Sequence, residues 1–152
     1  MFRGSLPGLF LVVSVACGGA PSADDGAMRV GVSFRALECT RDGVQAKLQV
    51  TGGYECPLVL RADGTAHGVC SAIPTGGIRD FRLVYFIVLE ANRPETLLEL
   101  ATAVITRDLT HYSDSELRLV FTPADLETDL DDDGDGQSNV TEFCLGTNPR
   151  GM

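Results

Sequence analysis

The chain has 152 residues, five cysteines and a formal net charge of −9, and its length suits one domain with a buried core. The negative charge is local, because residues 125–142 contain eight acidic side chains and no basic one. The rest of the chain is nearly neutral and shows no run of basic residues, which excludes nucleic acid as an expected partner.

The first residues predict export. Residues 1–16 have the form of a signal peptide, with a positive charge at Arg3 and an apolar segment too short to span a bilayer. Residues 13–18 (VSVACG) resemble a bacterial lipobox, which implies that Cys17 is lipidated; ordinary signal-peptidase cleavage after Ala16 is the alternative. In that family, Gly18 after the cysteine implies an outer-membrane or cell-surface lipoprotein, and a periplasmic or secreted protein is the alternative.

Residues 17–27 are small and polar, and we expect them to form a flexible tether. Beyond Cys17 an even number of cysteines remains, as is usual for an oxidising compartment. Three disulfide pairings of these cysteines are possible. A hairpin around residues 62–64 would place Cys56 opposite Cys70, within disulfide range, and exclusion would then pair Cys39 with Cys144.

Residues 28–124 predict a mainly β domain. Apolar and polar residues alternate over 30–36, 44–51 and 117–121, as in strands with one buried face, whereas 81–89 is apolar on both faces, as in a central strand. Turn signals separate these segments, and several short strands at this spacing predict an antiparallel sandwich. Residues 68–77 (GVCSAIPTGG) with FRLVY at 81–85 resemble a turn and strand of Ig-like and fibronectin-like sandwiches in bacterial surface proteins.

One segment of the β domain is ambiguous. In residues 95–107 the apolar positions also fit a helical stripe, and Pro94 could open a helix. Against a helix, the segment is rich in β-branched side chains, and the strand predicted before it needs a neighbour. We therefore expect a strand, with a helix as the alternative.

Residues 131–142 (DDDGDGQSNVTE) have the spacing of a twelve-residue calcium loop. Acidic side chains on alternate residues can point inward along a curling backbone, and Gly136 permits the sharp turn. Without a cation these carboxylates would repel one another. The expected Ca²⁺ ligands are Asp131, Asp133, Asp135, the backbone carbonyl of Gln137, Asn139 and Glu142.

The longer stretch from residue 131 to residue 149 resembles the bacterial thrombospondin type 3 repeat, a calcium-binding relative of the EF-hand. The resemblance implies that residues 125–152 form a calcium-binding repeat with a short exiting helix. A sensor EF-hand needs a full entering helix and an apolar residue at loop position 8, where this chain has Pro123 and Ser138. We therefore expect a structural site with a dissociation constant on the order of 10⁻⁴–10⁻³ M rather than a helix-opening switch.

The sequence predicts no catalytic site. His67 and His111 are the only histidines, and no serine lies in a known nucleophile motif. We expect a non-catalytic domain, held at the membrane by its lipid anchor, whose partners are calcium and an unidentified envelope protein in adhesion or assembly. The alternative is an accessory domain that binds a substrate or a partner for a secreted enzyme system.

Overall fold

A computed structural model of the protein describes residues 27–37, 39, 42–90 and 92–151. The predicted signal peptide, Cys17 and all of the predicted tether except Ala27 lie outside these residues. The described elements are β1 (Ala27–Arg35), β2 (Val44–Val50), β3 (Tyr54–Leu60), β4 (Thr65–Pro74), β5 (Ile78–Glu90), β6 (Arg93–Asp108), β7 (Glu116–Leu119), the 3₁₀ turn η2 (Pro123–Asp125), β8 (Leu126–Glu127) and α1 (Asn139–Leu145).

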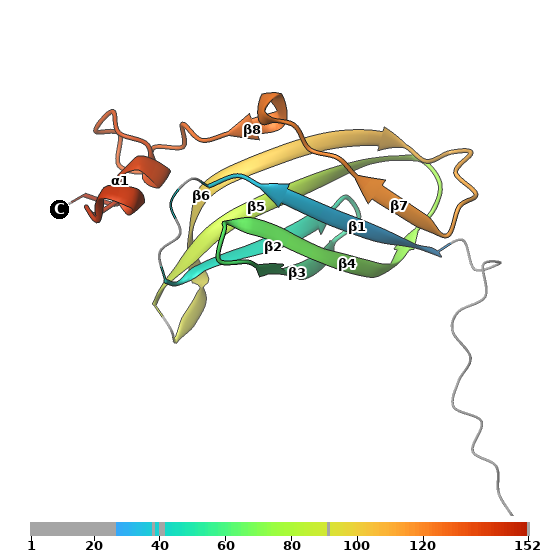
Figure 1. The fold of residues 1–152 in the computed structure, drawn as a ribbon, viewed down its shortest axis with the longest axis horizontal. Helices are drawn as coiled ribbons and strands as arrows, with labels where there is room; N and C mark the ends of the chain where they lie inside the picture. The colour runs from blue at the N-terminus through green and yellow to red at the C-terminus, as the bar shows by residue number, and fades with distance from the viewer. Residues whose placement is uncertain (1–26, 38, 40–41, 91, 152) are drawn as a thin grey trace, which may run out of the picture.

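The strands form one sheet in the order β7-β1-β4-β3-β2-β5-β6-β8, which curls into a half-barrel (Figure 1). The prediction of a mainly β protein is confirmed. The predicted antiparallel Ig-like sandwich is corrected in two respects. β1 and β7 pair in parallel, and β3 pairs with both β2 and β4, so that it joins the two arms of the sheet.

The β3–β4 hairpin has the predicted register. Val59 lies opposite His67 and Leu60 lies opposite Ala66. The ladder goes no further toward Pro57, a residue without an N–H to donate. The Cys56–Cys70 disulfide joins the two strands beyond this point, with the Cα atoms 5.7 Å apart. A covalent bond thus holds the strands where no ladder does.

Tyr85 links the arms of the sheet across the hydrophobic core. Its side chain is fully buried on β5. The hydroxyl donates to the Phe34 carbonyl oxygen at 2.6 Å and accepts from the Ala66 N–H at 3.3 Å. Because β1 and β4 supply these partners, one side chain ties β5 to the opposite arm. Burial raises the pKa of the Tyr85 hydroxyl, so it remains a donor at neutral pH.

The ambiguous segment is a strand, β6, which contains a β-bulge. Tyr85 pairs with Ala101 and Phe86 pairs with Glu99, which leaves Leu100 as an extra residue. Leu100 and Ala101 are both fully buried, although strict alternation would turn one of them outward. The bulge therefore shifts the phase of the buried face within one strand. Val104, which belonged to the apparent helical stripe, is 46% exposed.

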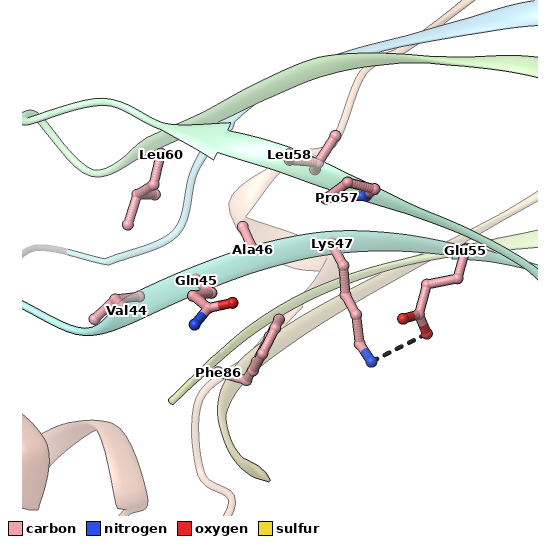
Figure 2. Close-up of a pocket in the computed structure, with 9 residues that line it drawn as sticks. All are labelled: Val44, Gln45, Ala46, Lys47, Glu55, Pro57, Leu58, Leu60 and Phe86. Carbon is pink, nitrogen blue, oxygen red and sulfur yellow. Dashed lines mark ion pairs between the residues drawn. The ribbon is translucent and has the colours of Figure 1, made fainter. Parts of the chain in front are cut away.

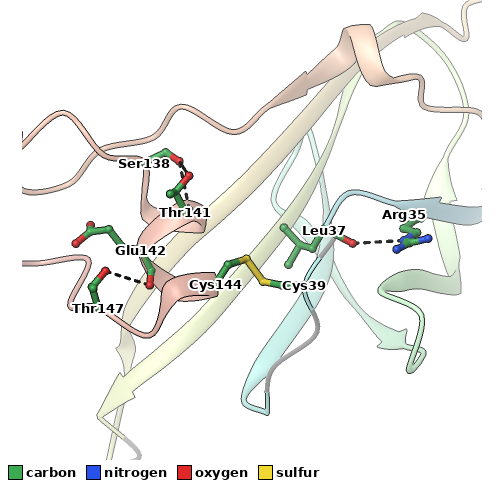
Figure 3. Close-up of a disulfide and its surroundings, with 8 residues drawn as sticks. All are labelled: Arg35, Leu37, Cys39, Ser138, Thr141, Glu142, Cys144 and Thr147. Atoms are coloured by element: carbon green, nitrogen blue, oxygen red, sulfur yellow. Dashed lines mark hydrogen bonds between the residues drawn. A yellow bond between two sulfur atoms is a disulfide. The ribbon is translucent and has the colours of Figure 1, made fainter.

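The C-terminal module lies at one end of the long axis, and the start of β1 lies at the other (Figure 1). Val140 and Phe143 of α1 pack against the core. The Cys39–Cys144 disulfide joins α1 to the segment that follows β1, with the Cα atoms 5.8 Å apart (Figure 3). This pair is the one that exclusion suggested. The module is thus held to the sheet by apolar packing and by a covalent bond.

Candidate metal centre

The loop before α1 is folded around the Asp131 carboxylate. Its Oδ1 accepts the Gly134 N–H at 2.7 Å, and its Oδ2 accepts the Gly136 N–H at 2.9 Å. Both glycines have positive φ angles, 73° and 91°, which other residues adopt only at a cost. The bond from Gly136 is the main reason that the pKa of Asp131 is lowered. Asp131 is therefore ionised and fixed in place.

Two further aspartates continue the curl. Asp133 Oδ1 accepts the Asp135 N–H at 3.2 Å, and Asp135 Oδ1 accepts the Gln137 N–H at 2.7 Å. These local side-chain to backbone turns direct the carboxylates to one side of the chain. Ligand oxygens of Asp131, Asp133 and Asp135 consequently lie within 4.8 Å of one another. This cluster could bind a metal ion.

Glu142 of α1, the fourth acidic ligand that the sequence predicts, is buried and does not belong to the cluster of three aspartates. Only 4% of the residue is exposed, and Oε2 has no hydrogen-bond partner among the described residues. Burial raises the pKa of Glu142, and the charges of Asp133, Asp135 and Asp131 raise it further. Figure 3 shows this side chain directed away from Cys144 and its disulfide. A buried carboxylate oxygen without a hydrogen-bond partner is unfavourable unless a cation compensates the charge.

Asn139 is placed differently from the ligand role expected of it. The residue is fully buried, and its Oδ1 accepts the Asp132 N–H at 2.9 Å. Its Nδ2 donates to the Glu99 carbonyl oxygen at 2.9 Å, which fastens the loop to β6. Gln137, in contrast, is exposed. The structure thus brings the three aspartates together, whereas the Asn139 amide forms hydrogen bonds to the protein itself.

Contacts from the end of the chain support the loop from outside. Arg150 Nε lies 3.7 Å from Asp132 Oδ2. Gly151 packs so closely on Asp133 that a Cβ atom at this position would lie 2.8 Å from Oδ2. Sequence reasoning missed both contacts, because the repeat motif ends at Pro149. The one hint in the sequence was Asp132, an acidic residue that occupies no ligand position and is therefore free to pair with a cation such as Arg150.

The donor set fits a hard divalent cation. All side chains in the cluster offer oxygen, which favours calcium or magnesium over the softer transition metals. One oxygen from each aspartate, a backbone carbonyl and the two Glu142 oxygens would supply about six ligands, the lower end of the range for calcium. Glu142 Oε2, which is buried and has no hydrogen-bond partner among the described residues, could serve as a further ligand.

Apart from the acidic loop, a groove of about 470 Å³ lies between β2, β3 and Phe86 of β5 (Figure 2). Lys47 is the cationic residue of its lining, and Nζ lies 3.0 Å from Glu55 Oε2. The same Nζ lies 5.2 Å from the centroid of the Phe86 ring. The charges of this groove thus neutralise each other, and it presents no free reactive group.

Comparison with protein-family models, with curated proteins and with solved structures finds no match to this chain. None of the helices in the described ranges is long and apolar enough to cross a bilayer. The two disulfides indicate an oxidising, exported environment.

Proposed function

We propose that the protein is an exported, lipid-anchored and non-catalytic β domain with a structural Ca²⁺ site in a thrombospondin type 3-like repeat at residues 125–152. Its role is adhesion or assembly at the cell envelope. The predicted lipidation of Cys17 would place the half-barrel at a membrane surface.

One observation carries the calcium proposal. Glu142 Oε2 is buried without a hydrogen-bond partner in the described part of the chain, and the charges of Asp133, Asp135 and Asp131 raise the pKa of Glu142. Folding without a cation would leave four acids together, one of them desolvated. A divalent cation converts this repulsion into attraction. Calcium is preferred because its large, flexible coordination shell accepts a two-oxygen contact from a glutamate.

The surroundings of the site favour a structural ion over a sensor. The exiting helix α1 has seven residues, and Cys144 within it is bonded to Cys39. Asn139 fastens the start of the same helix to β6. A helix held at both ends has little freedom to swing when the ion binds. Calcium is therefore expected to stiffen the end of the half-barrel.

Calcium titration with thermal melting tests the proposal. With a dissociation constant on the order of 10⁻⁴–10⁻³ M, about 10 mM calcium should raise Tm by roughly 5–10 °C. The rise should disappear in Asp133→Ala. Asp114→Ala is the matched control, because it removes an exposed acid from the loop before β7, and it should keep the full rise. No shift of the parent protein up to 10 mM calcium would refute the calcium site.

A further inference from the structure

Three arginines on one face of the half-barrel form no close ion pair or side-chain hydrogen bond among the described residues, although Asp63 lies near Arg61 and Glu116 lies opposite Arg29. Within the described ranges, four of the ten cationic Lys and Arg side chains form ion pairs, namely Lys47, Arg82, Arg93 and Arg150. Three more, Arg35, Arg79 and Arg107, donate to backbone carbonyls. The guanidinium groups of Arg29, Arg61 and Arg118 do neither. These three belong to β1, the β3–β4 turn and β7, so the unpaired charges share one arm of the sheet.

The register of this arm creates a hollow beside them. Gly31 of β1 lies between Arg118 of β7 and Val69 of β4. Because Gly31 has no side chain, the outer face is recessed there, and the hollow has a volume of about 280 Å³. Its polar lining consists of Ser33, Arg61, His67, Arg118 and one acid, Glu116. Two arginines and one acid thus line a space large enough for a small anionic group.

We propose that this surface, termed the arginine face and defined as Arg29, Ser33, Arg61, His67 and Arg118, binds the phosphate groups of an anionic lipid surface. Guanidinium groups match phosphate oxygens with paired hydrogen bonds. Val59 and Val69 lie on the same face and are 61% and 48% exposed, so they add apolar contact beside the charges. The inference rests on the proposed anchoring of the chain at a membrane.

The start of β1 brings part of the face within reach of the proposed anchor. β1 begins at Ala27, ten residues after Cys17, and a chain of that length reaches at most about 35 Å. Arg29 and Arg118 lie near the start of β1, and Arg61 lies near its end, where the β3–β4 turn faces Arg35. The face therefore runs along β1, and an anionic membrane would attract it along this length.

Vesicle sedimentation tests the arginine face. The Cys17→Ser variant, purified from an export host so that no acyl chain is attached, is mixed with phosphatidylcholine vesicles with or without phosphatidylglycerol. Calcium is kept equal in all samples. We expect binding only to the anionic vesicles and release by salt. Arg61→Glu/Arg118→Glu should weaken it at least about twentyfold, since each arginine near an anionic surface contributes about fivefold.

Arg93→Glu/Arg107→Glu is the matched control, because it makes the same change of charge at exposed positions on β6. It should leave vesicle binding unchanged. Equal binding to both kinds of vesicle would overturn the proposal, and so would equal loss in the two double variants. Competition by inorganic phosphate without any preference for anionic vesicles would also overturn it, in favour of a small-anion site. Mass spectrometry of membrane-bound wild-type protein tests the anchor separately.

Discussion

At the scale of single residues, Glu142 connects the fold to the metal site. It lies in the first turn of α1, where its burial follows from the packing of the helix against the sheet. The same burial removes water from a carboxylate beside three aspartates. The side chain should therefore oppose folding when the loop holds no cation, and under the proposed function it should support folding when calcium is bound.

Glu142→Gln should have opposite effects on Tm in the calcium-free and the calcium-bound protein. In chelator, the variant should melt above the parent protein, because it removes a desolvated charge from an acidic cluster. In calcium, it should melt below the parent, because a two-oxygen anionic ligand is lost. Thermal melting of both proteins in both conditions measures the crossover. A variant that melts below the parent in both conditions would contradict this role.

The pH dependence in chelator has a definite sign. The pKa of Glu142 is raised in the folded protein, so the folded state holds this proton more tightly than the unfolded chain does. Protonated Glu142 contributes to the stability of the folded state. This contribution is complete below the pKa of the unfolded chain and is lost as the pH rises through the pKa of the folded protein. The difference in Tm between Glu142→Gln and the parent should thus be largest near neutral pH. It should close as the pH falls toward the ordinary glutamate value of 4.5.

Asn139→Ala distinguishes two roles of Asn139, a structural one that fastens the loop to β6 and a ligand role toward calcium. The amide bonds Asp132 and Glu99, so its removal should cost about 1–3 kcal/mol of unfolding free energy, with or without calcium. A ligand role would predict a loss in calcium alone. Urea unfolding in calcium and in chelator separates the two cases. Gln137→Ala, at an exposed position in the same loop, is the control and should change little.

At the scale of elements, bulges shape the sheet. In β4 the pairing shifts between Met28↔Ile73 and Val30↔Cys70, so Ser71 and Ala72 together face Arg29. Ala72 takes a φ angle of 60°, a left-handed conformation that disfavours a side chain with a Cβ atom. The strand accepts this strain because the bulge keeps Cys70 and Ile73 both buried.

Ala72→Gly should stabilise the protein by up to about 1 kcal/mol, because glycine adopts this conformation without strain. Ala62→Gly is the control at an exposed turn position without a positive φ angle. There the added freedom of the unfolded chain should destabilise by roughly 0.5–1 kcal/mol. Urea midpoints measure both changes. Similar losses in the two variants would show that the Ala72 backbone is not strained.

At the scale of the whole molecule, the two disulfides do different work. Cys56–Cys70 spans 14 residues and holds a local hairpin, whereas Cys39–Cys144 spans 105 residues and fastens α1 to the segment that follows β1. The long link also positions Glu142, which lies two residues from Cys144. The stability of the ion site and that of the half-barrel are therefore coupled.

Double variants with serine in place of both cysteines of a disulfide should separate the contributions of the two disulfides to stability. From the entropy of loop closure, Cys39→Ser/Cys144→Ser should cost about 4.7 kcal/mol and Cys56→Ser/Cys70→Ser about 3 kcal/mol. Only the first pair should also reduce the rise in Tm that calcium produces, because it frees α1. Urea unfolding and calcium-dependent melting measure the two effects. An undiminished calcium response in the first pair would show that α1 is positioned without the disulfide.

The sequence alone determined the features that depend on local spacing. Alternation predicted the strands, because side chains in a strand point to opposite faces. The Asp and Gly positions of residues 131–136 predicted the curled acidic loop, since its turns are made within a few residues. The symmetry of the hairpin around residues 62–64 placed Cys56 opposite Cys70 for the same reason.

Only the tertiary structure decided which surfaces meet. Alternation shows that one face of a strand is buried but not which strand lies beside it, so the parallel β1–β7 pair and the curl of the sheet were beyond prediction. Asn139 fits a ligand position in the motif, and only the tertiary structure shows that its amide also donates to the carbonyl oxygen of Glu99, forty residues away. The arginine face was equally invisible, because Arg29, Arg61 and Arg118 are far apart in sequence and long-range pairing alone brings them together.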